Sequence, residues 1–168
     1  MPNEEKSKKK LKTGELELTN EQLETYLGSV SIANIRTCKS ASAASKHKIF
    51  QVTMALTESP EAKAYQATKK DLFEREGEEI PENELQEGQR KGQKTILKES
   101  NPEGHAEMME LLDRSSDIII KKPLLPMDEF EGCSEADFSG SAWIFDWRAT
   151  AKEVRDIENP KKKGGKNK

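Results

Sequence analysis

Apolar residues recur along the chain in short segments that predict a mixture of helices and strands. Near residue 20, Thr19 and Gln22 have the spacing of a capping box, and Leu18 and Leu23 occupy the flanking hydrophobic-staple positions. Gly28 is a natural stop for a helix. The pattern therefore predicts a short helix that closes over a core.

The next two apolar segments, residues 30–35 and 47–57, predict strands. Between residues 47 and 57 the apolar side chains Phe50, Val52, Met54 and Leu56 alternate with polar or small ones, which is the period of a half-buried strand. Small polar residues separate the two segments. We therefore expect an antiparallel ribbon with a polar loop near 38–46.

Two serine- or asparagine-proline pairs predict helix starts, at Ser59-Pro60 and at Asn101-Pro102, because such side chains cap helices and proline suits the first turn. Gly77 is expected to end the first of these helices. Further along, the pattern predicts a strand over 117–121, an extended Pro-Leu-Leu-Pro segment over 123–126, a strand over 141–148 and a final helix over 149–157.

These elements do not alternate regularly between strand and helix, which favours an α+β fold. We expect a mainly antiparallel sheet of roughly four to six strands with about three to four short helices. The predicted organisation is a basic flexible arm over 1–12, a single domain over 13–159 and a basic flexible tail over 160–168. Polar loops are expected near 38–46, 77–94 and 122–140.

The composition indicates a thin hydrophobic core. Charged residues make up 35% of the chain, the mean hydropathy is −0.90, and Leu, Ile, Val and Phe together number 31 of 168 residues. That share lies just below the one-fifth level at which disorder becomes a serious alternative. A chain with so little apolar material often depends on a partner or an assembly for stability.

Charge is divided between basic ends and an acidic body. Residues 1–12 have a net charge of +3 and residues 160–168 of +5, so with −3 overall the residues between them carry −11. Flexible cations of this kind bind phosphate, their own acidic body or that of a neighbour. The candidate partner-binding or nucleic-acid-binding residues are Lys8, Lys9, Lys10, Lys12, Lys161, Lys162, Lys163, Lys166 and Lys168. Lysine offers a point charge, which argues against recognition of base sequence.

Trp143, Phe145 and Trp147 lie on one face of the strand expected over 141–148. Three aromatic rings in a row suit stacking on single-stranded bases. The alternative is that they form the core face of a central strand, because large aromatic side chains dominate core energetics. The sequence leaves both interpretations open.

No motif specifies a catalytic, nucleotide or metal site, so we expect no cofactor and no metal. The loop from Gly88 to Thr95 lacks the Walker spacing, and the acidic residues between 128 and 137 lack the EF-hand pattern. The Pro123–Pro126 segment has the PxxP form, although a connector after a strand explains it more simply. The two cysteines, Cys38 and Cys133, are expected to be free thiols, and the two histidines are His47 and His105.

The leading functional hypothesis is a non-enzymatic structural or accessory subunit of a larger assembly, an oligomer or a complex, whose basic termini contact acidic protein surfaces or nucleic acid. The alternative is a nucleic-acid-binding accessory protein for single strands or a ribonucleoprotein. A small enzyme that uses Cys38 or His105 is a third hypothesis. The start of the chain lacks the apolar stretch of a secretory signal, and no apolar run is long enough to span a membrane. We therefore expect a soluble cytoplasmic protein, or a nuclear one in a eukaryote.

Overall fold

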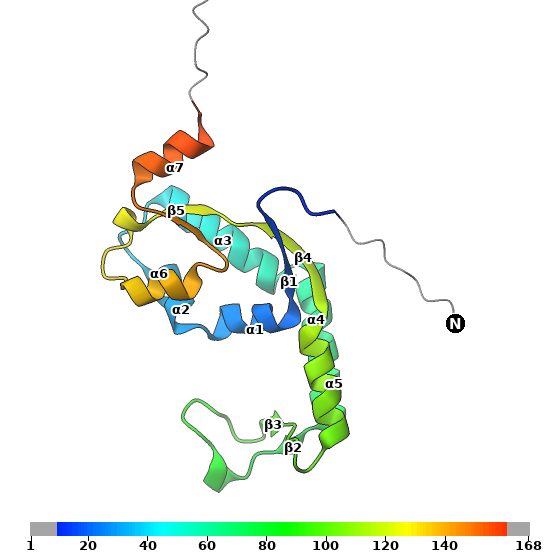
Figure 1. Ribbon diagram of the computed structural model, residues 1–168. Helices are drawn as coiled ribbons and strands as arrows, with labels where there is room; N and C mark the ends of the chain where they lie inside the picture. Colours follow the sequence, from blue (N-terminus) through cyan, green and yellow to red (C-terminus); the bar gives the residue numbers. More distant parts are fainter. Residues whose placement is uncertain (1–9, 161–168) are drawn as a thin grey trace, which may run out of the picture. The chain divides into compact units, whose positions relative to one another are not determined.

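The structure is a computed structural model that describes residues 10–160, in which there are seven α-helices and three two-stranded sheets (Figure 1). The described chain divides into two compact units. Unit 1 comprises residues 10–17, 29–51 and 119–160, and unit 2 comprises residues 18–28 and 52–118. Each unit has its own set of buried apolar side chains, and each is described separately below.

Unit 2 begins with helix α1 (Asn20–Gly28), and the predicted capping box at its start is confirmed. The Thr19 N–H donates to Gln22 Oε1 at 3.0 Å, and the Gln22 N–H donates to Thr19 Oγ1 at 3.3 Å. The reciprocal bonds satisfy two donors that the first turn of a helix leaves free. Leu23 and Tyr26 on the inner face of α1 are fully buried.

The longest helix of unit 2 is α4 (Pro60–Glu76), which packs beside α5 (Pro102–Asp113) (Figure 1). Both predicted starts are confirmed, because Ser59 and Asn101 cap these helices with their side-chain oxygens. Gly77 follows the last turn of α4, as predicted. The remaining elements are β2 (Glu78–Glu79) and β3 (Lys94–Thr95), which pair antiparallel, and the 3-10 helix η1 (Glu82–Glu84) between them.

Unit 1 is built around α2 (Val30–Thr37) and α6 (Glu135–Ser141), which lie against each other (Figure 1). The helices approach so closely that a Cβ placed on Gly140 would lie 2.7 Å from Ser31 Oγ. Asn34 Nδ2 of α2 donates to Asp137 Oδ1 of α6 at 3.0 Å. The same Asp137 completes a capping box with Ser134, so one carboxylate both begins α6 and binds α2.

A small parallel strand pair forms the other part of unit 1. Strand β5 (Leu124–Pro126) pairs with β6 (Asp146–Arg148), and the connection between them contains the 3-10 helix η2 (Met127–Glu129) and α6. Parallel strands require such a crossover. The final helix, α7 (Ala151–Glu158), packs on this pair. The expected strand over 117–121 and the final helix are thus both present, with β4 spanning Ser115–Lys121.

Strands β1 (Glu15–Thr19) and β4 form the third sheet. Their ends are joined by hydrogen bonds from the Lys122 N–H to the Gly14 carbonyl and from the Asn20 N–H to the Arg114 carbonyl. Pairing of the start of one strand with the end of the other makes the pair antiparallel.

The predicted fold, a mainly antiparallel sheet of four to six strands with three to four short helices, is wrong, because residues 10–160 form seven helices and only short two-stranded sheets. Helices dominate both units, and within residues 10–160 every sheet has only two strands. The hydrophobic residues of the core come mostly from helix faces, with short strands contributing side chains such as Leu18, Ile118 and Leu125.

The two predicted strands over 30–35 and 47–57 are helices. Residues 30–35 belong to α2, and residues 47–57 belong to α3 (Ala43–Thr57), so the loop expected near 38–46 is shorter than predicted. In α3 the buried side chains are Ile49, Val52 and Leu56, whereas Phe50 and Met54 are exposed. Spacings of three and four residues place the buried set on one helix face. The alternating set expected for a strand also contains Val52 and Leu56, so this segment fits both the two-residue period of a strand and the 3.6-residue period of a helix.

The predicted strand over 141–148 is also wrong for most of its length. Only residues 146–148 form a strand, β6, whereas Ser141 ends α6 and residues 142–145 form a turn. The N–H groups of Ile144 and Phe145 both donate to the Ser141 carbonyl, which closes this turn.

Candidate functional site

Two of the nine lysines predicted to contact a partner are in the described part of the chain. Lys10 and Lys12 are both exposed, ahead of β1. The others, Lys8, Lys9, Lys161, Lys162, Lys163, Lys166 and Lys168, lie outside the described residues.

Acidic charge is concentrated in unit 2. Its described residues include eighteen acidic and nine basic side chains, a net charge of −9, whereas unit 1 has eleven of each between residues 10 and 160 and is neutral. Five exposed glutamates lie within the connection between α4 and β3, namely Glu78, Glu79, Glu82, Glu84 and Glu87. No basic residue interrupts this sequence between Glu76 and Gln89. The acidic body inferred from the sequence is therefore essentially unit 2.

The aromatic residues Trp143, Phe145 and Trp147 do not form a row along one strand. Phe145 is 1% exposed, and Trp143 and Trp147 are half-buried. The Trp147 ring makes edge contacts with three phenylalanine rings, and its Nε1–H donates to Ser141 Oγ at 3.0 Å. Trp147 and Phe145 therefore contribute to packing within unit 1, where their ring faces contact protein.

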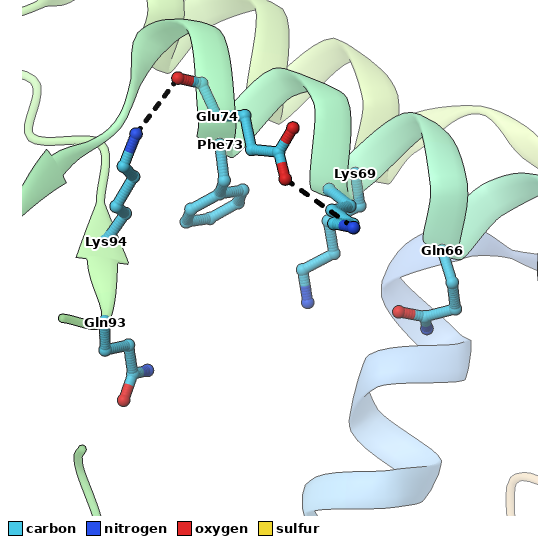
Figure 2. Close-up of a pocket in the computed structure, with 7 residues that line it drawn as sticks. Gln66, Lys69, Phe73, Glu74, Gln93 and Lys94 are labelled. Atoms are coloured by element: carbon cyan, nitrogen blue, oxygen red, sulfur yellow. Dashed lines mark hydrogen bonds and ion pairs between the residues drawn. The ribbon is translucent and has the colours of Figure 1, made fainter. Parts of the chain in front are cut away.

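A surface hollow of about 460 Å³ lies in unit 2 where α4 meets β3 (Figure 2). Phe73 supplies its apolar wall, and Lys69, Lys70, Lys94 and Glu74 line it, with Lys70 Nζ 3.6 Å from Glu74 Oε1. The amides of Gln66 and Gln93 also line the hollow. Figure 2 shows Lys94 and Gln93 on the β3 side and the other labelled residues on α4.

Hydrogen bonds fix two of these lysines. Lys69 Nζ lies 2.8 Å from Glu24 Oε1 and 6.0 Å from the centre of the Phe73 ring. Figure 2 shows the bond that Lys94 Nζ donates to the Glu74 carbonyl, at 3.1 Å. The Tyr65 hydroxyl also donates to Glu24 Oε1, at 2.9 Å. Burial and then this carboxylate raise the pKa of Tyr65 well above its usual value. Fixed cations beside an aromatic ring suit a ligand that has both a flat apolar part and an anionic part.

The two cysteines, far apart in sequence, meet in unit 1. Cys38 follows the last turn of α2, Cys133 lies just before α6, and the two thiols lie close enough for each to shift the pKa of the other. Cys38 Sγ lies 3.2 Å from Ser40 Oγ and 3.6 Å from the Glu131 carbonyl oxygen. Both cysteines line a hollow of about 490 Å³, and both are half-buried. Nothing in their spacing predicted this pair.

The pKa values of the two thiols are shifted in opposite directions. Partial burial acts to raise the pKa of Cys38, but hydrogen bonds from Ser40, Ala41 and Cys133 outweigh it and lower the pKa. Burial, and then the charge and hydrogen bond of Cys38, raise the pKa of Cys133 to about 11. Cys38 is therefore the thiol that ionises first.

His47 is exposed on α3, and His105 lies on α5 in unit 2. Among the described residues the Cys38 sulfur contacts Ser40 and Glu131, and these contacts give no support to a cysteine–histidine dyad. Within residues 10–160 no three potential ligands among His, Cys, Asp and Glu are grouped as a metal site requires.

The acidic residues between 128 and 137 act in local structure. Asp128 Oδ1 accepts the Ala151 N–H at the start of α7, and Asp137 caps α6. Glu129 Oε2 accepts hydrogen bonds from Ser42 and Ser45 at the start of α3. Three of the acids between 128 and 137, namely Asp128, Glu129 and Asp137, thus contact helix N-termini, where negative charge is stabilising.

The chain has no significant match among protein-family models, among curated proteins or among solved structures. Between residues 10 and 160, no helix combines the length and apolar character needed to cross a bilayer.

Proposed function

We propose that the protein is a non-enzymatic structural or accessory subunit of a larger assembly, in which its lysine-rich termini contact acidic protein surfaces. The observation that carries this proposal is the segregation of charge: unit 2 has a net charge of −9, unit 1 is neutral, and the terminal segments are basic. Unit 2 of a second copy is the acidic surface that the chain itself supplies.

Electrostatic contacts of this kind act collectively. A single exposed ion pair contributes about 0–1 kcal/mol, so several lysines must engage several carboxylates for a stable contact. The exposed glutamates from Glu78 to Glu87 provide such a set within a short stretch of chain. Because salt screens exposed charges over about 8–10 Å at physiological ionic strength, the association should weaken steeply as salt is added.

Both units also expose large apolar side chains that a protein partner could cover. In a chain with a mean hydropathy of −0.90, Val30 of α2 is 75% exposed, Phe50 of α3 is 58% exposed and Met109 of α5 is 52% exposed. Aromatic and methionine side chains are enriched at protein interfaces. They support protein partners in preference to a small-molecule substrate.

Light scattering coupled to size-exclusion chromatography tests the proposal with the full chain at low and high salt. We expect oligomers at low salt that dissociate at high salt. The triple variant Glu79→Gln, Glu84→Gln, Glu87→Gln should dissociate at lower salt than the wild type. A matched triple variant of unit 1, Glu131→Gln, Glu135→Gln, Asp156→Asn, changes the net charge equally and should behave like the wild type. A monomer at every salt concentration, or equal effects of both triple variants, would contradict the proposal.

A second candidate function is binding of single-stranded nucleic acid, which the hollow beside Phe73 favours. A base stacked on that ring would place its phosphates near Lys69, Lys70 and Lys94. This site replaces the aromatic row expected from the sequence, and its three lysines add to those of the termini.

Fluorescence anisotropy with labelled single-stranded and duplex oligonucleotides separates the candidates. If the hollow binds bases, Phe73→Leu weakens binding of single strands, while Phe50→Leu, a change at an exposed ring on α3, leaves it unchanged. Lys94→Gln should reduce the slope of log affinity against log salt by about one. Absence of binding at low salt excludes this candidate.

A further inference from the structure

The hollow between the end of α2 and the turn before α6 contains both cysteines of the chain. Cys38 and Cys133 both line this hollow although 94 residues separate them in sequence. Both side chains are half-buried, so small solutes reach the sulfurs through the hollow. A pair of thiols held together in this way can react as a unit.

The surrounding contacts hold the two thiols in place. The Cys38 N–H donates to the Ile35 carbonyl at the end of α2, and the Cys133 N–H donates to the Phe130 carbonyl. The hydrogen bond between Asn34 and Asp137 joins the two helices next to the thiols. Gly132, directly before Cys133, has φ +83°, a conformation that favours glycine and turns the chain toward α2.

Ser40 links the Cys38 thiol to residues 129–131. Its hydroxyl donates to the Glu129 carbonyl at 2.7 Å and accepts the Glu131 N–H at 2.8 Å. Because the only hydroxyl proton of Ser40 is donated to the Glu129 carbonyl, a protonated Cys38 must donate its own proton to Ser40 Oγ. When Cys38 ionises, the hydroxyl can turn its proton toward the sulfur and stabilise the thiolate.

We propose that Cys38 and Cys133 form a dithiol site that reacts with low-molecular-weight disulfides and closes an internal disulfide. The Cys38 thiolate attacks one sulfur of the disulfide RSSR, displaces RS⁻ and forms a mixed disulfide. Cys133 loses its proton to solvent, attacks the Cys38 sulfur and displaces the second RS⁻. RSSR is reduced to two RSH, and the two cysteines are oxidised to one disulfide, so atoms and electrons balance.

The order of the two steps follows from the acidities of the thiols. Cys38 has the lowered pKa and ionises more readily, so it is the attacking thiol, whereas Cys133, whose pKa is raised, is the resolving thiol. The resulting bond would join α2 to the turn before α6. This site is independent of the charge-driven assembly proposed above, because it involves neither the termini nor unit 2.

The test uses the reduced full-length protein, glutathione disulfide as the probe and intact-mass spectrometry as the readout. We expect the wild type to lose two hydrogen atoms without retaining glutathione. Cys133→Ser should retain one glutathione at Cys38. Cys38→Ser should react at least about tenfold more slowly, because burial and the charge of Asp137 still raise the pKa of the remaining thiol.

A second measurement on the wild type needs no variant. The ratio of internal disulfide to mixed disulfide is measured at one glutathione concentration in buffer and in concentrated urea. We expect the ratio to be at least about a hundredfold higher in the folded protein, because folding holds the thiols together. Stable glutathione adducts on both cysteines of the wild type, covalent dimers, or the same ratio in urea would each overturn the proposal.

Discussion

The carboxylate of Glu129 holds the start of α3 in unit 1, so replacing it tests how that unit is stabilised. One oxygen, Oε2, accepts hydrogen bonds from Ser42 Oγ at 2.6 Å, from Ser45 Oγ at 2.7 Å and from the Ser42 N–H at 3.2 Å. Ser45 is only 4% exposed. Removal of the Glu129 carboxylate would leave the buried hydroxyl of Ser45 without its ionised acceptor.

The size of the effect follows from these bonds. A hydrogen bond to a charged group contributes about 1.5–3 kcal/mol, but bonds that share one oxygen are not additive. We therefore expect Glu129→Ala to lower the free energy of unfolding by about 2–3 kcal/mol. Glu129→Gln keeps an acceptor oxygen and loses the charge, so its cost should be about 1–2 kcal/mol.

The pH dependence gives the prediction a sign. Burial acts to raise the pKa of Glu129, but the bonds from Ser42 and Ser45 and the charge of Lys48 outweigh it and lower the pKa. A lowered folded-state pKa stabilises the fold above the unfolded pKa of about 4.3, and the contribution is lost as pH falls through the folded value. The difference between wild type and Glu129→Gln should be largest near neutral pH and shrink in acid.

Urea unfolding followed by circular dichroism, at neutral pH and in acid, measures these differences. Glu131→Gln is the matched control, because Glu131 is an exposed glutamate two residues further along the same loop. If Glu129→Gln and Glu131→Gln unfold at the same urea concentration at neutral pH, the carboxylate does not stabilise the start of α3. A difference between Glu129→Gln and wild type that grows in acid would contradict the assigned sign.

Three further predictions concern local packing. Gly77→Ala should lower the melting temperature, because the new Cβ would lie 2.4 Å from the Phe73 carbonyl oxygen of α4. Gly28→Ala is the control in the same thermal denaturation, because nothing lies within 4 Å of a Cβ placed there. Trp147→Phe should cost about 1–2 kcal/mol in urea unfolding, because the fully buried hydroxyl of Ser141 loses its indole donor. Tyr65 should ionise at a higher pH than free tyrosine in an ultraviolet titration, because its pKa is raised. Its contribution to stability is therefore present below the unfolded pKa of about 10 and is lost as pH rises through the folded-state pKa.

Features encoded by near neighbours in the sequence were predictable. The capping box of Thr19 and Gln22, the caps at Ser59 and Asn101 and the stop at Gly77 all occur where predicted. The caps depend on side chains that contact backbone within a few residues, and the stop at Gly77 depends on the residue type itself, so tertiary structure does not have to be known.

Features decided by packing were not predictable from one sequence. Residues 49–56 contain both an alternating set and a helical set of apolar positions, and only burial of Ile49 against the core selects the helix. The contact between Glu129 and the serines Ser42 and Ser45 joins segments more than 80 residues apart. The Cys38–Cys133 pair has the same origin, because α2 and α6 bring together two residues whose spacing follows no motif.

The segregation of charge predicts how salt affects any assembly that it drives. Two copies that place their lysine-rich termini on each other's unit 2 reciprocally form a closed dimer, and one-way contacts lead to rings or filaments, but salt screens the attraction in both cases. A two-fold dimer through unit 2 would instead bring two surfaces of net charge −9 together, and its repulsion would be relieved by salt. Added salt therefore weakens the first kind of assembly and strengthens the second. The direction in which oligomer mass changes with salt distinguishes them without any variant.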